Sequence, residues 1–161
     1  MLLSAFTLFH VAISLIGIAS GFVVVYGLLV SKGFDGWTKL FLWTTVATSV
    51  TGFMFPVHKF LPSHGLAILS LIVLTIAFVA RYRHHLTGGW RRTYVITAVL
   101  ALYFNVFVLI VQLFEKVPAL EALAPTQSEP PFQAAQLTAL IIFAALAIRG
   151  AMKFRAGEIH A

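Results

Sequence analysis

Long apolar stretches alternate with short polar ones along this chain. Five of the apolar stretches are long enough to cross a bilayer, because a transmembrane helix needs about 20 predominantly apolar residues. None shows the strict alternation of apolar and polar residues that is typical of a strand, and open sheet edges do not occur in lipid. The pattern therefore predicts five membrane-spanning helices, at about residues 3–30, 38–55, 64–81, 93–114 and 132–152.

The composition supports the same class of protein. Of the 161 residues, 60% are hydrophobic and only 10% are charged, which is more apolar surface than a soluble domain of this length can bury. We therefore expect an all-α integral membrane bundle, forming one domain over residues 1–161, in contact with the lipid bilayer. Between the fourth and fifth spans, Pro118 to Leu123 could form one turn of helix at the membrane surface.

The distribution of charge predicts an orientation. If five spans alternate, nine of the eleven basic residues fall on one side of the membrane, and Lys59 and Lys116 fall on the other side with three glutamates. By the positive-inside rule the N-terminus is outside and the C-terminus is cytoplasmic. The net charge of +6 does not indicate nucleic-acid binding, because no basic face with interleaved aromatic residues occurs outside the loops. The nine residues are Lys32, Lys39, Arg81, Arg83, Arg91, Arg92, Arg149, Lys153 and Arg155.

Polar residues within the spans carry most of the functional information, because they are costly in lipid. In the first span His10, Ser14, Gly17 and Gly21 share one helix face. The Gly17-x-x-x-Gly21 spacing allows another backbone to come close, so this face is expected to contact protein. The other polar side chains on the second and fourth spans include Thr44, Thr48, Thr51, Asn105, Gln112 and Glu115.

Three histidines lie at the same predicted depth, near the outer face. The segment TGFMFPVHKFLPSH, residues 51–64, joins the second and third spans and contains His58 and His64, with Ser63 as the expected N-cap of the third helix. Neutral imidazole is the commonest metal ligand, and two histidines from different helices can hold a haem iron. The leading specific hypothesis is an outward-facing polar pocket that binds haem b or a divalent metal. Its ligands would be His10, His58 and His64, with Asn105, Gln112 and Glu115 around them.

Other interpretations of the same residues stay open. His10 could simply form a hydrogen bond with a threonine or asparagine of another helix, while His58 and His64 are solvated loop residues. The same residues could also line a pocket for a quinone, a lipid or another small molecule. The five-residue spacing between His58 and His64 matches no metal-ligand motif. A rival class is a structural or assembly subunit that contacts other membrane subunits or associates with itself. A channel or carrier is disfavoured, because no span has a charged residue near its centre.

Several kinds of chemistry have no residues to perform them. The chain has no cysteine, which excludes disulfides, thiolate metal sites and cysteine nucleophiles. No hydrolase, phosphate-binding or zinc-protease motif is present. Any redox activity would therefore depend on a bound cofactor.

Three pieces of sequence carry a resemblance: TGFMFPVHKFLPSHG, GGWRRTYV and APTQSEPPF. They resemble segments of small bacterial inner-membrane proteins to which no activity is attached. The resemblance implies a polytopic protein of the bacterial inner membrane and no particular chemistry. A small bundle with histidines near its outer face is also similar to membrane b-type cytochromes. This chain lacks the pairs of histidines at two depths that are usual in those proteins.

Overall fold

A computed structural model describes residues 2–56 and 62–155, and all regular secondary structure in these residues is helical. The expected all-α class is therefore confirmed for this part of the chain. The helical turn predicted between the fourth and fifth spans is present at Pro118–Leu123. The elements are α1 (Leu2–Leu29), α2 (Asp35–Gly52), α3 (Pro62–Phe78), the π-helical turn η1 (Val79–Arg83), α4 (Trp90–Lys116), α5 (Pro118–Leu123) and α6 (Pro130–Lys153).

Four helical segments in the described residues are long and apolar enough to span a membrane: α1, α3 continued by η1, α4 and α6. This is typical of a multi-pass membrane protein in contact with lipid. The second predicted span is also a helix, of 18 residues, but it is not one of these four. α2 is more polar than these four segments, because it contains five threonines, one serine, Asp35 and Lys39.

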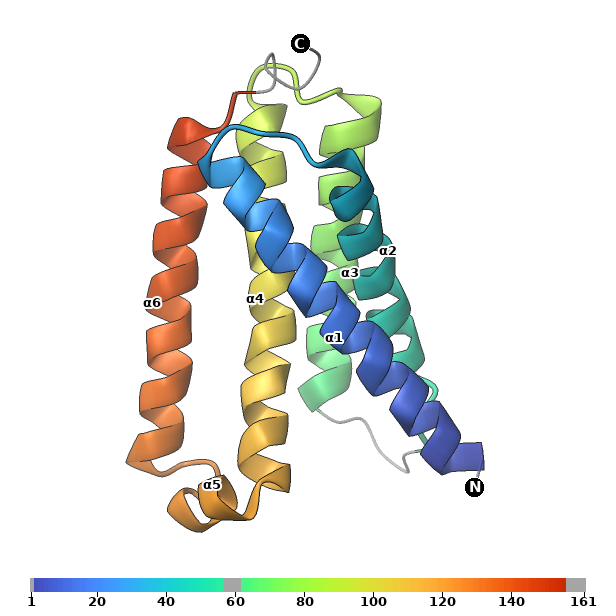
Figure 1. Ribbon diagram of the computed structural model, residues 1–161, viewed down its shortest axis with the longest axis vertical. Coiled ribbons are helices and arrows are strands. Elements are labelled where there is room, and N and C mark those ends of the chain that lie inside the picture. The colour runs from blue at the N-terminus through green and yellow to red at the C-terminus, as the bar shows by residue number, and fades with distance from the viewer. Residues whose placement is uncertain (1, 57–61, 156–161) are drawn as a thin grey trace.

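The helices form a bundle in which α1 crosses the others obliquely (Figure 1). α4 stands in the middle, with α6 on one side of it and α2 and α3 on the other. The N-terminal half of α1 lies beside α2, while its C-terminal half passes α4 and reaches α6. Phe22 of α1, for example, packs against Phe143 of α6 with their ring centroids 6.2 Å apart.

The small residues of α1 mark the places where it touches its neighbours. A Cβ atom added to Gly21 would lie 2.6 Å from Leu102 Cδ1 and 2.9 Å from Phe41 Cε2, both fully buried side chains. A Cβ atom on Gly17 would lie 3.1 Å from the Thr44 hydroxyl oxygen. The prediction that this face of α1 contacts protein rather than lipid is confirmed.

Of the basic residues that the structure describes, all except Lys116 lie toward one end of the bundle, which we call the basic end. It is the end with the α1–α2 and η1–α4 turns (top of Figure 1). The described residues at the opposite end include Lys116 and three glutamates. At the basic end Arg81 forms an ion pair with Asp35 of α2. Its guanidinium carbon also lies 5.3 Å from the ring centroid of Tyr94 in α4, so that one side chain joins three elements.

The end of α6 is fastened to the same end of the bundle. Arg91 Nη1 donates hydrogen bonds to the carbonyl oxygens of Phe154 and Ala151, the second at 3.2 Å. The Ser31 hydroxyl donates to the carbonyl oxygen of Lys153 at 3.3 Å. The cationic Arg91 side chain therefore satisfies carbonyl groups that a helix C-terminus leaves without partners.

Candidate functional site

α2 is joined to three neighbouring helices by side-chain hydrogen bonds. His10 Nδ1 of α1 lies 2.7 Å from Thr51 Oγ1. Asn105 Nδ2 of α4 donates to Thr45 Oγ1 at 3.2 Å. The hydroxyl of Ser49 in α2 donates a hydrogen bond to the hydroxyl oxygen of Ser70 in α3 at 3.3 Å, and both residues are buried. Such bonds let a helix with polar side chains pack inside a membrane bundle.

The partner of His10 defines the state of its imidazole. Thr51 Oγ1 lies 2.7 Å from the carbonyl oxygen of Ala47, four residues back, and a helical threonine commonly donates its hydrogen there. The hydroxyl oxygen can then accept a hydrogen from His10 Nδ1, and a neutral imidazole bonded in this way keeps its lone pair on Nε2. The ring is also held edge-on against Phe55, with centroids 5.1 Å apart. The hydrogen bond across helices, one of the two interpretations of His10, is confirmed.

His64 contacts Phe53, the residue that follows the end of α2. It is the third residue of α3, only 7% of its surface is exposed, and its ring stacks on Phe53 at 5.6 Å between centroids. The interpretation of His64 as a solvated loop residue is therefore wrong. Ser63 is also not the N-cap: α3 begins at Pro62, and proline favours the first position of a helix.

The three residues expected around the histidines are distributed between two places. Asn105 contacts α2, but its partner Thr45 precedes Thr51 by six residues, which is about 9 Å along the helix. Gln112 Nε2 lies 3.4 Å from Glu115 Oε2 at the exposed end of α4. There Glu115 lines a depression of about 270 Å³ shared with residues of α5 and the loop that follows it.

The connection between α5 and α6 is ordered by one carboxylate. Glu129 accepts hydrogen bonds from the Thr126 hydroxyl at 2.7 Å and from the backbone N–H of Ser128 at 3.1 Å. The Thr126 hydroxyl is the main reason that the pKa of Glu129 lies below its usual value, since these bonds favour the ionised form. Gln127 of the same connection donates to the carbonyl oxygen of Val111 in α4 at 3.1 Å.

A metal or haem site is not shown by the described residues. Within residues 2–56 and 62–155, no group of three or more His, Asp or Glu residues is arranged to hold a metal ion. His58 lies outside these residues. Binding through His10, His58 and His64 therefore stays a prediction.

Some polar groups of the interior were not singled out from the sequence. Thr45 and Ser49 are buried, whereas Thr44, Thr48 and Thr51, the threonines singled out from the sequence, are only partly buried. Both buried residues follow Phe41 at intervals of four, which places them on its face of the helix. A large aromatic residue did not identify this face from the sequence, because Trp43 of α2 is also large and aromatic and is 62% exposed.

Comparisons with family models, with curated proteins and with solved structures found no match for this chain. The resemblance to bacterial inner-membrane proteins and the similarity to b-type cytochromes therefore stay predictions. The function has to be argued from the geometry of the chain itself.

Proposed function

We propose that the chain crosses a bacterial inner membrane five times, with its N-terminus outside and its C-terminus in the cytoplasm. The 18 residues of α2 rise about 27 Å, close to the thickness of the hydrocarbon core. Its polar side chains have partners on three neighbouring helices, which lowers the cost of placing them in lipid. The clustering of basic residues at one end supports a cytoplasmic C-terminus.

Within that membrane, the geometry best supports a structural role: a subunit that assembles with other membrane-spanning proteins. The observation that carries this proposal is the pairing of polar side chains across the interior of the bundle. Three polar side chains of the interior, those of His10, Asn105 and Ser70, each have a hydrogen-bond partner on α2. The apolar outer faces remain as the surface for recognition.

The outer face of α6 is the best candidate for contact with another subunit. In its apolar window only 11% of the residues are buried within the chain, against 44% in α4. Ala134, Thr138, Ile141 and Ala145 follow each other at helical spacing along this face, and all are exposed. Small residues at intervals of four allow helices to approach closely in a membrane.

A pair of matched substitutions tests the assembly role. Wild-type protein purified gently from its own membrane should carry another membrane subunit in fixed proportion. Ala145→Leu should reduce that complex about tenfold, because an extra side chain in a helix contact costs about 1–3 kcal/mol. Ala144→Leu makes the same change about 100° around α6, where it should have no effect.

The two variants should have the same thermal unfolding midpoint as the wild type, because both positions are exposed. The assembly role is excluded if wild-type protein emerges from its own membrane with no other subunit and no second copy. Equal loss of the complex in both variants would show that the α6 stripe is not the contact.

A ligand site at the histidines is the second candidate, favoured by the geometry of His10. Thr51 fixes the imidazole through Nδ1 and leaves Nε2 available, as second-shell hydrogen bonds do for metal-ligating histidines. His64 and His58 would be the further ligands, whereas Asn105 contacts Thr45 and Gln112 contacts Glu115. Such a site would bind haem b or a divalent metal, and a haem would supply one-electron redox chemistry.

The absorbance spectrum and the metal content of the purified protein test this candidate. His10→Ala should remove the bound group, and Thr51→Val should weaken its binding about 10- to 100-fold by releasing the imidazole. Ser14→Ala is the control, because Ser14 lies one turn further along the same face of α1 and its hydroxyl donates to the carbonyl oxygen of His10 rather than to a side chain. A wild-type protein with no Soret band and no stoichiometric metal would eliminate the candidate.

A further inference from the structure

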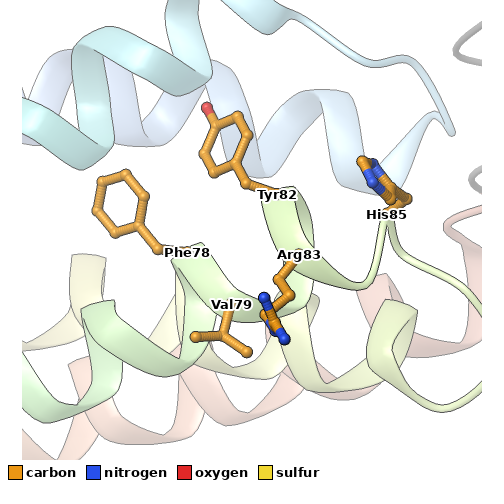
Figure 2. Close-up of a pocket in the computed structure, with 5 residues that line it drawn as sticks. All are labelled: Phe78, Val79, Tyr82, Arg83 and His85. Atoms are coloured by element: carbon orange, nitrogen blue, oxygen red, sulfur yellow. The ribbon is translucent and has the colours of Figure 1, made fainter.

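The outer surface of α3 carries an open depression where the helix meets the basic end of the bundle. Its volume is about 540 Å³ (Figure 2). Phe78 and Tyr82 project from one side of the helix, and Val79 and Arg83 project from the other. His85 lies at the end of the depression, beyond the last turn. The aromatic side chains thus lie on one side of the depression, and the aliphatic side chain and the guanidinium group lie on the other.

Arg83 differs from Arg81 and Arg91, two nearby arginines that form bonds within the bundle. Arg81 is paired with Asp35, and Arg91 is bonded to carbonyl groups at the end of α6. Arg83 is exposed and has no acidic partner among the described residues. A guanidinium group at the surface of a membrane protein attracts a phosphate, which it can bind through two parallel hydrogen bonds.

The turn after η1 presents a second side chain that can bind a phosphate, the imidazole of His85. His84 stacks on Trp90, with ring centroids 3.9 Å apart, and is thereby held against the start of α4. His85 follows with φ of +48°, a left-handed conformation that turns the chain, and its side chain is exposed. An imidazole in this position can donate a hydrogen bond to a phosphate beside Arg83.

An apolar track leads from the depression toward the middle of the membrane. Ile72, Ile76, Val79 and Arg83 follow at intervals of four, three and four residues, which places them along one side of the helix. Ile72 and Ile76 are 53% and 39% exposed. An acyl chain lying on this track would have its headgroup at the level of Arg83.

We propose that this depression binds an anionic phospholipid, with its phosphate at Arg83 and His85 and one acyl chain along Val79, Ile76 and Ile72. Positive charge at the headgroup level and an adjoining apolar track fit a lipid, whereas a soluble phosphate compound would use the charge alone. The proposal requires only that the basic end lies at a headgroup layer. It is therefore independent of the assembly role proposed above.

Trp43 provides a native reporter for the occupant. The centroid of its ring lies 5.3 Å from that of Phe78, which lines the depression. Trp43 itself is 62% exposed. In a Trp37→Phe/Trp90→Phe background, the protein is placed in phosphatidylcholine nanodiscs that contain a small fraction of dibrominated lipid. Dibrominated phosphatidylglycerol should quench Trp43 fluorescence at several-fold lower mole fraction than dibrominated phosphatidylcholine.

Arg83→Gln should reduce this preference about fivefold, the effect expected for one basic residue near an anionic lipid. Arg92→Gln is the control, because Arg92 is also exposed at this end but does not line the depression. Equal quenching by the two brominated lipids, or an equal effect of both substitutions, would overturn the proposal. Restoration of the fluorescence by millimolar inorganic phosphate would show instead that a soluble phosphate compound is the ligand.

Discussion

Gly21→Val is expected to lower the free energy of unfolding by about 3 kcal/mol, the upper part of the range for inserting atoms into a packed core. An added Cβ atom at this position meets Leu102 at 2.6 Å and Phe41 at 2.9 Å. Neither side chain can move aside into lipid, because both are fully buried. The helices α1, α2 and α4 would have to separate at their common crossing. Reversible unfolding in mixed detergent micelles measures the change.

Glycine-to-alanine substitutions separate the clash from the general effect of a side chain. Gly36→Ala should be neutral or stabilising by up to about 1 kcal/mol, because a Cβ atom there meets nothing within 4 Å and alanine favours the helix. Gly17→Ala should fall between, since only the Thr44 hydroxyl is close, at 3.1 Å. Leu102→Val should partly rescue Gly21→Ala by removing the nearest methyl group. A Gly21→Ala variant as stable as Gly36→Ala would contradict the close approach of these helices.

The helices could be predicted from the sequence because their signals are local. Apolar stretches of about 20 residues require helices in lipid, and prolines mark where helices begin. The inward face of α1 was also predictable, because Gly17 and Gly21 repeat at helical spacing. The spanning status of α2 is less secure in the sequence, since its threonines lower the hydropathy while their hydrogen-bond partners lie on other helices.

The site was less predictable, because it depends on how α1 is tilted. The sequence places His10 at the same depth as Gln112 and Glu115, but depth does not say which helices are adjacent. Since α1 crosses obliquely, its N-terminal half lies beside α2 and away from the C-terminal end of α4 (Figure 1). His10 therefore meets Thr51, while Gln112 and Glu115 contact each other.

At the basic end of the bundle, too, the contacts between distant residues could not be predicted from the sequence. The ion pair of Arg81 with Asp35 joins residues 46 positions apart, and the sequence could assign both only to the cytoplasmic side. The π-helical turn that contains Arg81 was not anticipated either. Such turns insert one residue into an otherwise regular helix, and no local residue pattern in VARYR marks the insertion.

Single cysteines should report opposite sides of the membrane for the two ends of α2. The chain has no cysteine of its own, so each introduced thiol is the only one present. Met54→Cys and Leu123→Cys are both at exposed positions of the end opposite to the basic end. Both should react with a membrane-impermeant maleimide applied to intact cells or spheroplasts. Gly36→Cys and Thr87→Cys should react only after the membrane is permeabilised.

The comparison of Gly36 with Met54 determines the number of spans, because these residues flank α2. Labelling of both from the same side would mean that α2 does not cross, which leaves the four more apolar helices as the spans. Labelling of all four positions with the sides exchanged would keep five spans and reverse the orientation. Five spans with an outside N-terminus are expected, because the bonds of α2 to three neighbours compensate its polar side chains and nine basic residues then remain in the cytoplasm.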